Sequence, residues 1–193
     1  MFFVWFVVES FKPIAKAGKS ALSPERRERT PTMDARALRH TLGSFATGVC
    51  VITVADPDHV HGHVLGMTAN SFSSVSLDPP LVQWCIDLKA HRYKVYAEAR
   101  TFGINILSGR QQTLSRRFAR ANAHIVPSER LTADRHPLRL RDVAGFLACE
   151  QYETRTVGDH LVIVGRVTQF DGDTARTGLT FFRGKYGYVR GKT

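Results

Sequence analysis

The sequence is poor in cysteine and has no long apolar run, and both shortages narrow what the protein can be. Its 193 residues include three cysteines, Cys50, Cys85 and Cys149, which lie far apart and form no C-x-x-C pair. An odd, scattered set argues against a disulfide framework or a structural zinc site and favours a reducing cytoplasm. No stretch approaches the ~20 apolar residues of a membrane helix, so we expect no membrane partner.

Catalytic motifs are lacking as well. The chain has no G-x-S-x-G nucleophile elbow and no G-x-G-x-x-G after a predicted strand, and its 17 carboxylates are dispersed. His59, His61 and His63 alternate, which would place metal ligands on one face of an extended chain, but no cysteine or carboxylate supports them nearby. We interpret them as loop histidines and expect no metal site. Such a chain often leaves its chemistry to a cofactor.

Acidic residues are also scarce beside basic ones. Lysine and arginine number 27, and the net charge of +10 favours an anionic partner: nucleic acid, acidic lipid or a phosphorylated small molecule. The basic residues are scattered, and no stripe of interleaved aromatic and basic residues typical of RNA binding is present. We therefore expect no nucleic-acid partner.

The length predicts one main domain. Residues 1–8 are apolar but lack the basic flank of a signal peptide, and residues 23–32 are charged and flanked by proline. We predict a poorly ordered extension or a misassigned start over 1–32, and a folded domain over 33–193.

Within this domain, predicted strands outnumber helices. Asp34 is a good N-cap for a helix with Ala35, Leu38, Leu42 and Phe45 on its apolar face. Further helices are predicted over 91–99 and 111–121, the latter with Leu114 and Phe118 inward and Arg116, Arg117 and Arg120 outward. Predicted strands cover 49–55, 64–71, 81–87 and 101–107, a hairpin covers 145–156 and 161–170, and a last strand and turn cover 179–188. Residues 122–143 are predicted to be a polar surface excursion. The pattern predicts a mainly β fold, an antiparallel barrel or sandwich with flanking helices.

The most informative stretch is Gly66-Met-Thr-Ala-Asn-Ser-Phe-Ser-Ser-Val-Ser-Leu-Asp-Pro-Pro80. Six short hydrogen-bonding side chains fall within nine of its residues. Such a loop can hold a phosphate through backbone N–H groups and hydroxyls. Composition alone fits a serine-rich surface loop equally well.

Four separated segments carry a resemblance to a known family. Phe45-Ala-Thr-Gly-Val49, residues 66–80, Phe102-Gly-Ile-Asn-Ile-Leu107, Gly158-Asp-His160 and Phe182-Arg-Gly-Lys-Tyr-Gly187 resemble the short-chain flavin reductases, the reductase components of two-component flavin-dependent monooxygenases. The resemblance implies a split β-barrel that works as a homodimer, binds FMN or FAD and oxidises NADH or NADPH. Hydride would pass to the central-ring nitrogen of the flavin by positioning alone, with no catalytic side chain. Reduced flavin would then diffuse to a partner monooxygenase.

The resemblance also implies roles for individual residues. Thr68, Ala69, Asn70 and Ser71 would contact the isoalloxazine and ribityl groups, Ser74, Val75 and Ser76 the phosphate, and Cys85 the ring system; Thr47, Met67 and His91 complete the implied flavin contacts. The nicotinamide nucleotide would meet Asp159, His160, Arg183 and Tyr186. Judged without the family, Cys85 fits core packing, His160 fits a turn histidine, and Tyr186 fits an aromatic that closes the barrel. The alternative function is a non-catalytic split barrel that holds flavin or haem.

Overall fold

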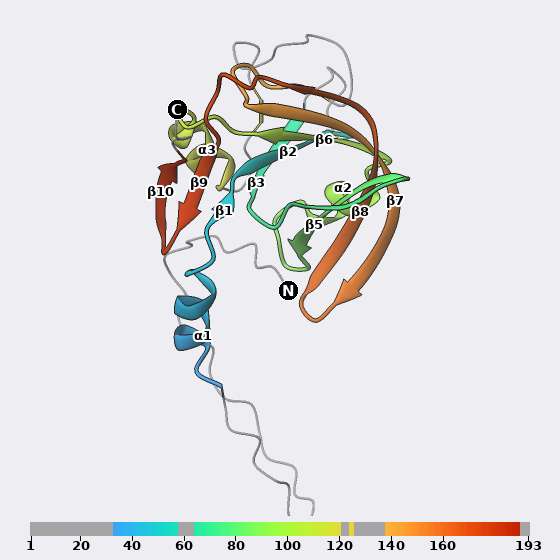
Figure 1. Cartoon of the computed structure of the whole chain (residues 1–193). Helices are drawn as coiled ribbons and strands as arrows, with labels where there is room; N and C mark the ends of the chain where they lie inside the picture. Colours follow the sequence, from blue (N-terminus) through green and yellow to red (C-terminus); the bar gives the residue numbers. More distant parts are fainter. Residues whose placement is uncertain (1–32, 58–63, 121–123, 126–137, 190–193) are drawn as a thin grey trace, which may run out of the picture.

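The computed structural model describes residues 33–57, 64–120, 124–125 and 138–189 (Figure 1). Its helices are α1 (Ala35–Leu42), α2 (Tyr93–Glu98) and α3 (Gln112–Phe118). Its strands are β1 (Thr47–Gly48), β2 (Cys50–Ala55), β3 (Val64–Ala69), β4 (Ser73–Leu77), β5 (Pro80–Asp87), β6 (Thr101–Ile106), β7 (Gly145–Val157), β8 (His160–Gly172), β9 (Leu179–Phe182) and β10 (Lys185–Tyr188).

A curved seven-stranded sheet forms the body of the molecule. Its strand order is β3-β2-β6-β7-β8-β5-β4, and every pairing is antiparallel. The long β7–β8 hairpin bends around one side of the sheet, while β1, β9 and β10 form a separate small sheet (Figure 1). The prediction of a mainly β, antiparallel barrel with flanking helices is confirmed.

One apolar core fills the inside of the curved sheet. Trp84 lies at its centre, fully buried, with edge-on contacts to Phe102 and to Tyr96 of α2. β-branched and aromatic residues from β2, β5 and β6 surround it, as expected for strands that pack their side chains on a pleated surface. Burial raises the pKa of the Tyr96 hydroxyl, so that side chain stays neutral.

A second core lies on the outer face of β2 and β6, beneath α3. Val51 and Phe118 belong to it, together with Leu138 and Leu140. The prediction that residues 122–143 are a polar surface excursion is therefore wrong for Leu138, Leu140 and Val143, which are buried, whereas Arg141 and Asp142 are exposed as predicted. The backbone of the 138–143 segment is held by buried polar groups of the sheet, since Thr53 Oγ1 donates to the Leu138 carbonyl (2.8 Å) and the Leu140 N–H donates to Asn105 Oδ1 (2.8 Å).

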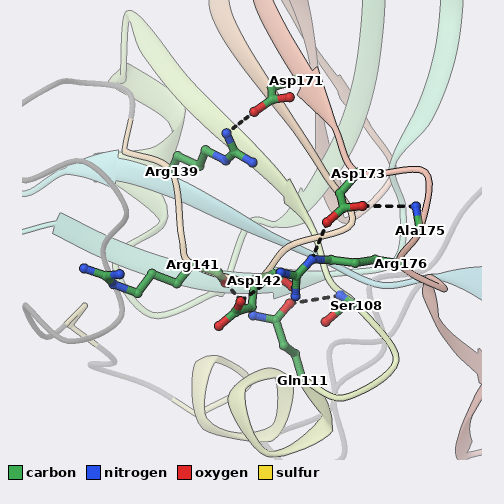
Figure 2. A network of polar contacts seen from close by, with 9 residues as sticks. All are labelled: Ser108, Gln111, Arg139, Arg141, Asp142, Asp171, Asp173, Ala175 and Arg176. Atoms are coloured by element: carbon green, nitrogen blue, oxygen red, sulfur yellow. Dashed lines mark hydrogen bonds and ion pairs between the residues drawn. The ribbon is translucent and has the colours of Figure 1, made fainter.

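Ion pairs hold the same segment to the end of β8 and to the chain that follows it. Arg139 pairs with Asp171, and Arg176 pairs with both Asp142 and Asp173 (Figure 2). Gln111, just before α3, joins this network through its side-chain amide, which donates to the Arg141 carbonyl at 2.8 Å. The start of α3 is thereby connected to the 138–143 segment and, through the ion pairs of that segment, to the chain around the end of β8.

Two predicted boundaries differ from the structure. Residues 73–77, interpreted as a loop, form the edge strand β4, because Val75 and the short serines are compatible with pairing against β5. The predicted final strand and turn is a hairpin of two strands, β9 and β10. The histidines at 59, 61 and 63 lie outside the described residues.

Helix α1 lies apart from the barrel (Figure 1). Asp34 caps it as predicted, because its carboxylate accepts from the Arg36 N–H at 2.8 Å. None of its residues is buried, and Phe45 falls in the turn beyond the helix, 62% exposed. No described helix is long and apolar enough to cross a membrane.

Candidate active site

A cavity of about 540 Å³ lies between α3, the end of β3 and the β9–β10 hairpin; Figure 1 shows α3 beside β9 and β10. Its volume falls within the ~300–1,000 Å³ range of small-molecule sites. The lining residues are Val49, Thr68, Asn70, Gln112, Arg116, Ala119, Arg120, Phe181, Gly184, Lys185 and Tyr186. Three of the predicted contacts therefore share one cavity, and we call Thr68, Asn70 and Tyr186 the cavity group.

The alternation of β3 decides which predicted residues reach this cavity. Successive strand residues point to opposite faces. Thr68 lies on the face beneath α3 and Asn70 follows it to the cavity wall, whereas Met67 and Ala69 pack into the core inside the sheet. Met67 and Ala69 can therefore contact a ligand in this cavity only through their backbone.

Ser115 of α3 connects the two sides of the cavity. Thr68 Oγ1 donates to the Ser115 carbonyl at 2.8 Å, and the hydroxyls of Ser115 and Tyr186 are 3.0 Å apart. The Tyr186 ring packs edge-on against Phe181, with ring centroids 5.2 Å apart. The Asn70 amide makes no hydrogen bond within the described part of the chain and is available to a ligand. Ser115 was missed by the sequence analysis, because a serine within a short helix gives no signal of its own.

The cavity wall is also positively charged. Arg116 and Arg120 line it, although the sequence pattern predicted only that they face outward. The Arg116 guanidinium lies 5.7 Å from the centre of the Tyr186 ring, within cation–π range. Lys185 of β10 adds a third cation, and the lining contains no carboxylate.

A second set of predicted contacts lies on β4, β5 and β8. We call Ser74, Val75, Ser76, Cys85 and His160 the sheet group. Ser71 joins this set to β3, since its hydroxyl accepts from the Cys85 N–H at 3.0 Å and donates to the Cys85 carbonyl at 3.2 Å. The Ser71 hydroxyl is thus already engaged in closing the barrel between the end of β3 and β5.

Strand β4 has an irregular register. Ser74 pairs with Val82 and Ser76 with Leu81, so Val75 is an extra residue on this edge strand. A bulge of this kind leaves backbone groups unpaired, and the backbone N–H groups and hydroxyls around Val75 are suited to a phosphate. These three residues do not line the α3 cavity.

Asp159 and His160 lie at the β7–β8 turn. The His160 Nδ1–H donates to Asp159 Oδ1 at 2.7 Å, and this hydrogen bond lowers the pKa of the Asp159 carboxyl. The other ring nitrogen, Nε2, is buried without a hydrogen-bond partner among the described residues. Register pairs His160 with Asp87, two residues beyond Cys85, so His160 belongs to the Cys85 side of the barrel.

Three predicted contacts lie elsewhere. Thr47 of β1 is paired with Phe181, and its buried hydroxyl has no partner in the described part of the chain. Arg183 lies in the β9–β10 turn with its guanidinium 3.3 Å from Ser44 Oγ, and it does not line the cavity. His91 is exposed just before α2.

The three cysteines are free and buried. Burial raises the pKa of the Cys50 and Cys149 thiols to about 12 and also raises that of Cys85. These thiols stay protonated at neutral pH and are poor nucleophiles. Within the described ranges no group of three metal-ligating side chains gathers. The cavity instead offers aromatic rings, a free amide and cations, which suits a planar, phosphate-bearing cofactor.

Comparison with known proteins identifies the family. The sequence profile of the Flavin reductase like domain matches residues 42–190. The chain belongs to the flavin reductase-like family. An "NADH-dependent flavin reductase" of Rhodococcus sp is 40% identical over 162 residues, which is 82% of this chain and 89% of that protein. The resemblance seen in the sequence is confirmed.

Two further relatives of this flavin reductase-like chain add detail. A "Flavin-dependent trigonelline monooxygenase, reductase component" of Acinetobacter baylyi is 38% identical over 155 residues, 78% of this chain and 48% of that protein. The chain thus spans about half the length of this and of another curated relative. The structure of the Streptomyces globisporus NADH:FAD oxidoreductase SgcE6, in complex with NAD and FAD fragments, superposes with a TM-score of 0.73 at 30% identity, over 81% of this chain and 93% of that one. The split-barrel fold predicted from the sequence is therefore confirmed.

Proposed function

We propose that this protein is an NAD(P)H-dependent flavin reductase. The observation that carries the proposal is the α3 cavity, where two predicted flavin contacts, Thr68 and Asn70, lie together with a predicted nicotinamide contact, Tyr186. The names of the relatives support the same activity.

Flavin, when bound, supplies the hydride-accepting chemistry. The chain's own residues contribute binding and orientation. Asn70 offers both a donor and an acceptor to the ring edge, and the Tyr186–Phe181 pair gives the cavity an aromatic wall. Thr68 is held against α3 by its hydrogen bond to Ser115, which fixes the backbone on which Asn70 is carried.

His160 is proposed to orient the nicotinamide. Its Nδ1–H is committed to Asp159, so in the neutral ring Nε2 carries the lone pair and acts as an acceptor. An unpartnered acceptor suits the N–H of a carboxamide. The flavin phosphate is assigned to the bulge at Ser74, Val75 and Ser76, with Cys85 beside the ring system and the backbone of Met67, Ala69 and Ser71 along its edge; Thr47, His91, Asp159 and Arg183 remain proposed contacts at the margins.

The co-substrate is proposed to be NADH, because the Rhodococcus relative and the S. globisporus oxidoreductase are named for it. Either FMN or FAD is proposed as the flavin that is reduced. Reduced flavin would pass to a monooxygenase component, as the name of the Acinetobacter relative suggests for that protein.

A homodimer is proposed as the working form. Its support is apolar surface that this chain leaves uncovered: Leu77 is 93% and Phe170 81% exposed, and α1 buries none of its residues. Light scattering on the purified protein tests this, with twice the 21.6 kDa chain mass as the expected result.

Free buried thiols are consistent with a cytoplasmic protein. Residues 1–32 are proposed to lie outside the functional domain, since the family match begins at residue 42.

One assay tests the activity. Purified protein is mixed with NADH or NADPH and with FMN or FAD, and loss of nicotinamide absorbance is followed. Turnover that requires added flavin is expected. A stoichiometric chromophore that stays bound without any turnover would instead favour the non-catalytic flavin- or haem-binding protein.

A further inference from the structure

Three cations converge on the α3 cavity. Arg116 and Arg120 are four residues apart, so they project from the same side of α3 and of the turn that follows it. Lys185 reaches the cavity from β10, a strand of the small sheet formed by β1, β9 and β10. The cluster is therefore assembled by the fold and cannot be recognised as a charge run in the sequence.

These cations lack acidic partners. The cavity lining contains no aspartate or glutamate, and none of the three forms an ion pair with a carboxylate in the described part of the chain. All three are exposed to solvent, whereas the half-buried Arg92 and Arg139 pair with Asp56 and Asp171. Cations left unpaired around one concave surface repel each other and concentrate an attractive field for anions.

We propose that Arg116, Arg120 and Lys185 form a phosphate-binding subsite of the α3 cavity. It would take a phosphate of the nucleotide whose ring lies against Asn70 and Tyr186. This is the diphosphate of NADH if the flavin phosphate lies at the β4 bulge, or the flavin phosphate itself in place of that bulge. Guanidinium groups bind phosphate oxygens in pairs, and the ammonium adds a point charge from the opposite wall. The identity of the nucleotide rests on the proposed function; the affinity for phosphate does not.

The position of Arg116 beside the aromatic wall of the cavity supports this assignment. The Arg116 guanidinium lies over the Tyr186 ring, whose hydroxyl is held by Ser115. An arginine held in this way loses less conformational freedom when it binds an anion. The competing explanation is that Arg116, in the last turn of α3, merely offsets the partial negative charge of the helix end. That explanation predicts an effect on stability and none on ligands.

The test uses matched ligands with and without phosphate. Calorimetry gives dissociation constants for FMN and for riboflavin, which lacks the phosphate. Steady-state kinetics compare NADH with a phosphate-free N-alkyl dihydronicotinamide as hydride donor. The variants are R116Q/R120Q and K185Q, and the control is R100Q, an exposed arginine outside the cavity lining. Circular dichroism checks that each variant is folded.

A roughly tenfold weakening is expected for R116Q/R120Q and about threefold for K185Q. If the subsite holds the diphosphate of NADH, the KM for NADH rises while both flavins and the phosphate-free donor are unaffected. If it holds the flavin phosphate, the dissociation constant for FMN rises towards that of riboflavin, whose own value stays constant. In either case the salt dependence of the affected constant becomes shallower than in R100Q.

Two results would overturn the subsite. One is an equal loss for ligands with and without phosphate; the other is no loss for any ligand in folded variants. The proposed function fails separately. Suppose that the wild-type protein shows no NADH-dependent turnover but binds FMN more tightly than riboflavin, and that R116Q/R120Q removes this preference. The phosphate subsite would then stand, and the proposed reductase activity would be rejected.

Discussion

The cavity group and the sheet group hold their predicted ligand contacts in different ways. Thr68, Asn70 and Tyr186 line one cavity beside α3, and Ser115 of α3 is the hydrogen-bonding partner of both Thr68 and Tyr186. The sheet group lies along β4, β5 and β8 and depends on strand register, a bulge at Val75 and a turn at Asp159. The cavity group thus lies against a helix, whereas the sheet group lies along strands.

This difference separates two ways to hold an anion. Around the bulge of β4 the groups are neutral hydroxyls and backbone N–H groups, whereas the α3 cavity supplies three formal charges. Neutral donors bind a phosphate with modest, weakly salt-dependent affinity, and exposed cations bind it with a strong salt dependence. The proposed reductase, which would release one nucleotide after turnover and recruit another, would gain from having both.

The largest expected effect comes from disturbing the helix behind the cavity. A Cβ at Gly66 would lie 2.6 Å from ring carbons of Phe118, the buried last residue of α3. We expect G66A to cost about 1–3 kcal/mol in the free energy of unfolding, measured by urea denaturation. It should also weaken ligand binding in the cavity, because Phe118 and Ser115 share α3. G178A is the control, since nothing lies within 4 Å of a Cβ there. Equal stability of the two variants would contradict the packing of α3 on β3.

The next effect concerns the link between the two groups. S71A removes a hydroxyl that both donates to and accepts from the backbone of Cys85, leaving two buried groups without partners. We expect a loss of about 1–2 kcal/mol in unfolding free energy with the dissociation constant for FMN changed less than about twofold. T156A, at an exposed position of β7 whose hydroxyl makes no hydrogen bond among the described residues, is the control for stability. A large loss of FMN binding at unchanged stability would instead assign the Ser71 hydroxyl to the ligand.

The sequence predicted the fold class because strand alternation and short hairpin loops are local signals. It could not predict that Leu138 and Leu140 are core residues, because their backbone is held in place by hydrogen bonds with Thr53 and Asn105, more than thirty residues away. Nor could it separate Thr68 from Ala69 within one motif. Family resemblance marks both residues, but only the register of β3 against β2 decides which one faces α3.

The cations of the cavity show the same limit. An amphipathic helix pattern correctly predicts that Phe118 is inward and that Arg116 and Arg120 are outward. Whether an outward face meets solvent or a cavity depends on β9 and β10, which come more than sixty residues later in the chain. Residue type alone therefore favoured a solvated face, and the site became visible only when the second sheet was placed beside α3.

A smaller effect is expected at His160, on the sheet side. H160A removes the proposed acceptor for the carboxamide, so the KM for NADH should rise about fivefold, the loss of one moderate hydrogen bond. The dissociation constant for FMN should change less than about twofold. H40A, on exposed α1, should leave both constants unchanged. If FMN binding falls while the KM for NADH stays constant, His160 belongs to the flavin side of the site.

The smallest expected effect is at Asp159, which fixes the His160 tautomer. Its pKa lies below the ordinary 3.8 because of the hydrogen bond with His160. The pair therefore contributes fully at pH values above 3.8 and is lost only as the pH falls through the lowered pKa. Across neutral pH the KM for NADH should show no titration from this carboxyl.

Since Asp159 is 81% exposed, D159N should raise that KM only about twofold, because the amide oxygen still accepts from Nδ1. D173N is the control, because Asp173 also has a lowered pKa but pairs with Arg176. A rise in D159N as large as in H160A would mean that the charge on Asp159, and not only its hydrogen bond, acts on the nicotinamide.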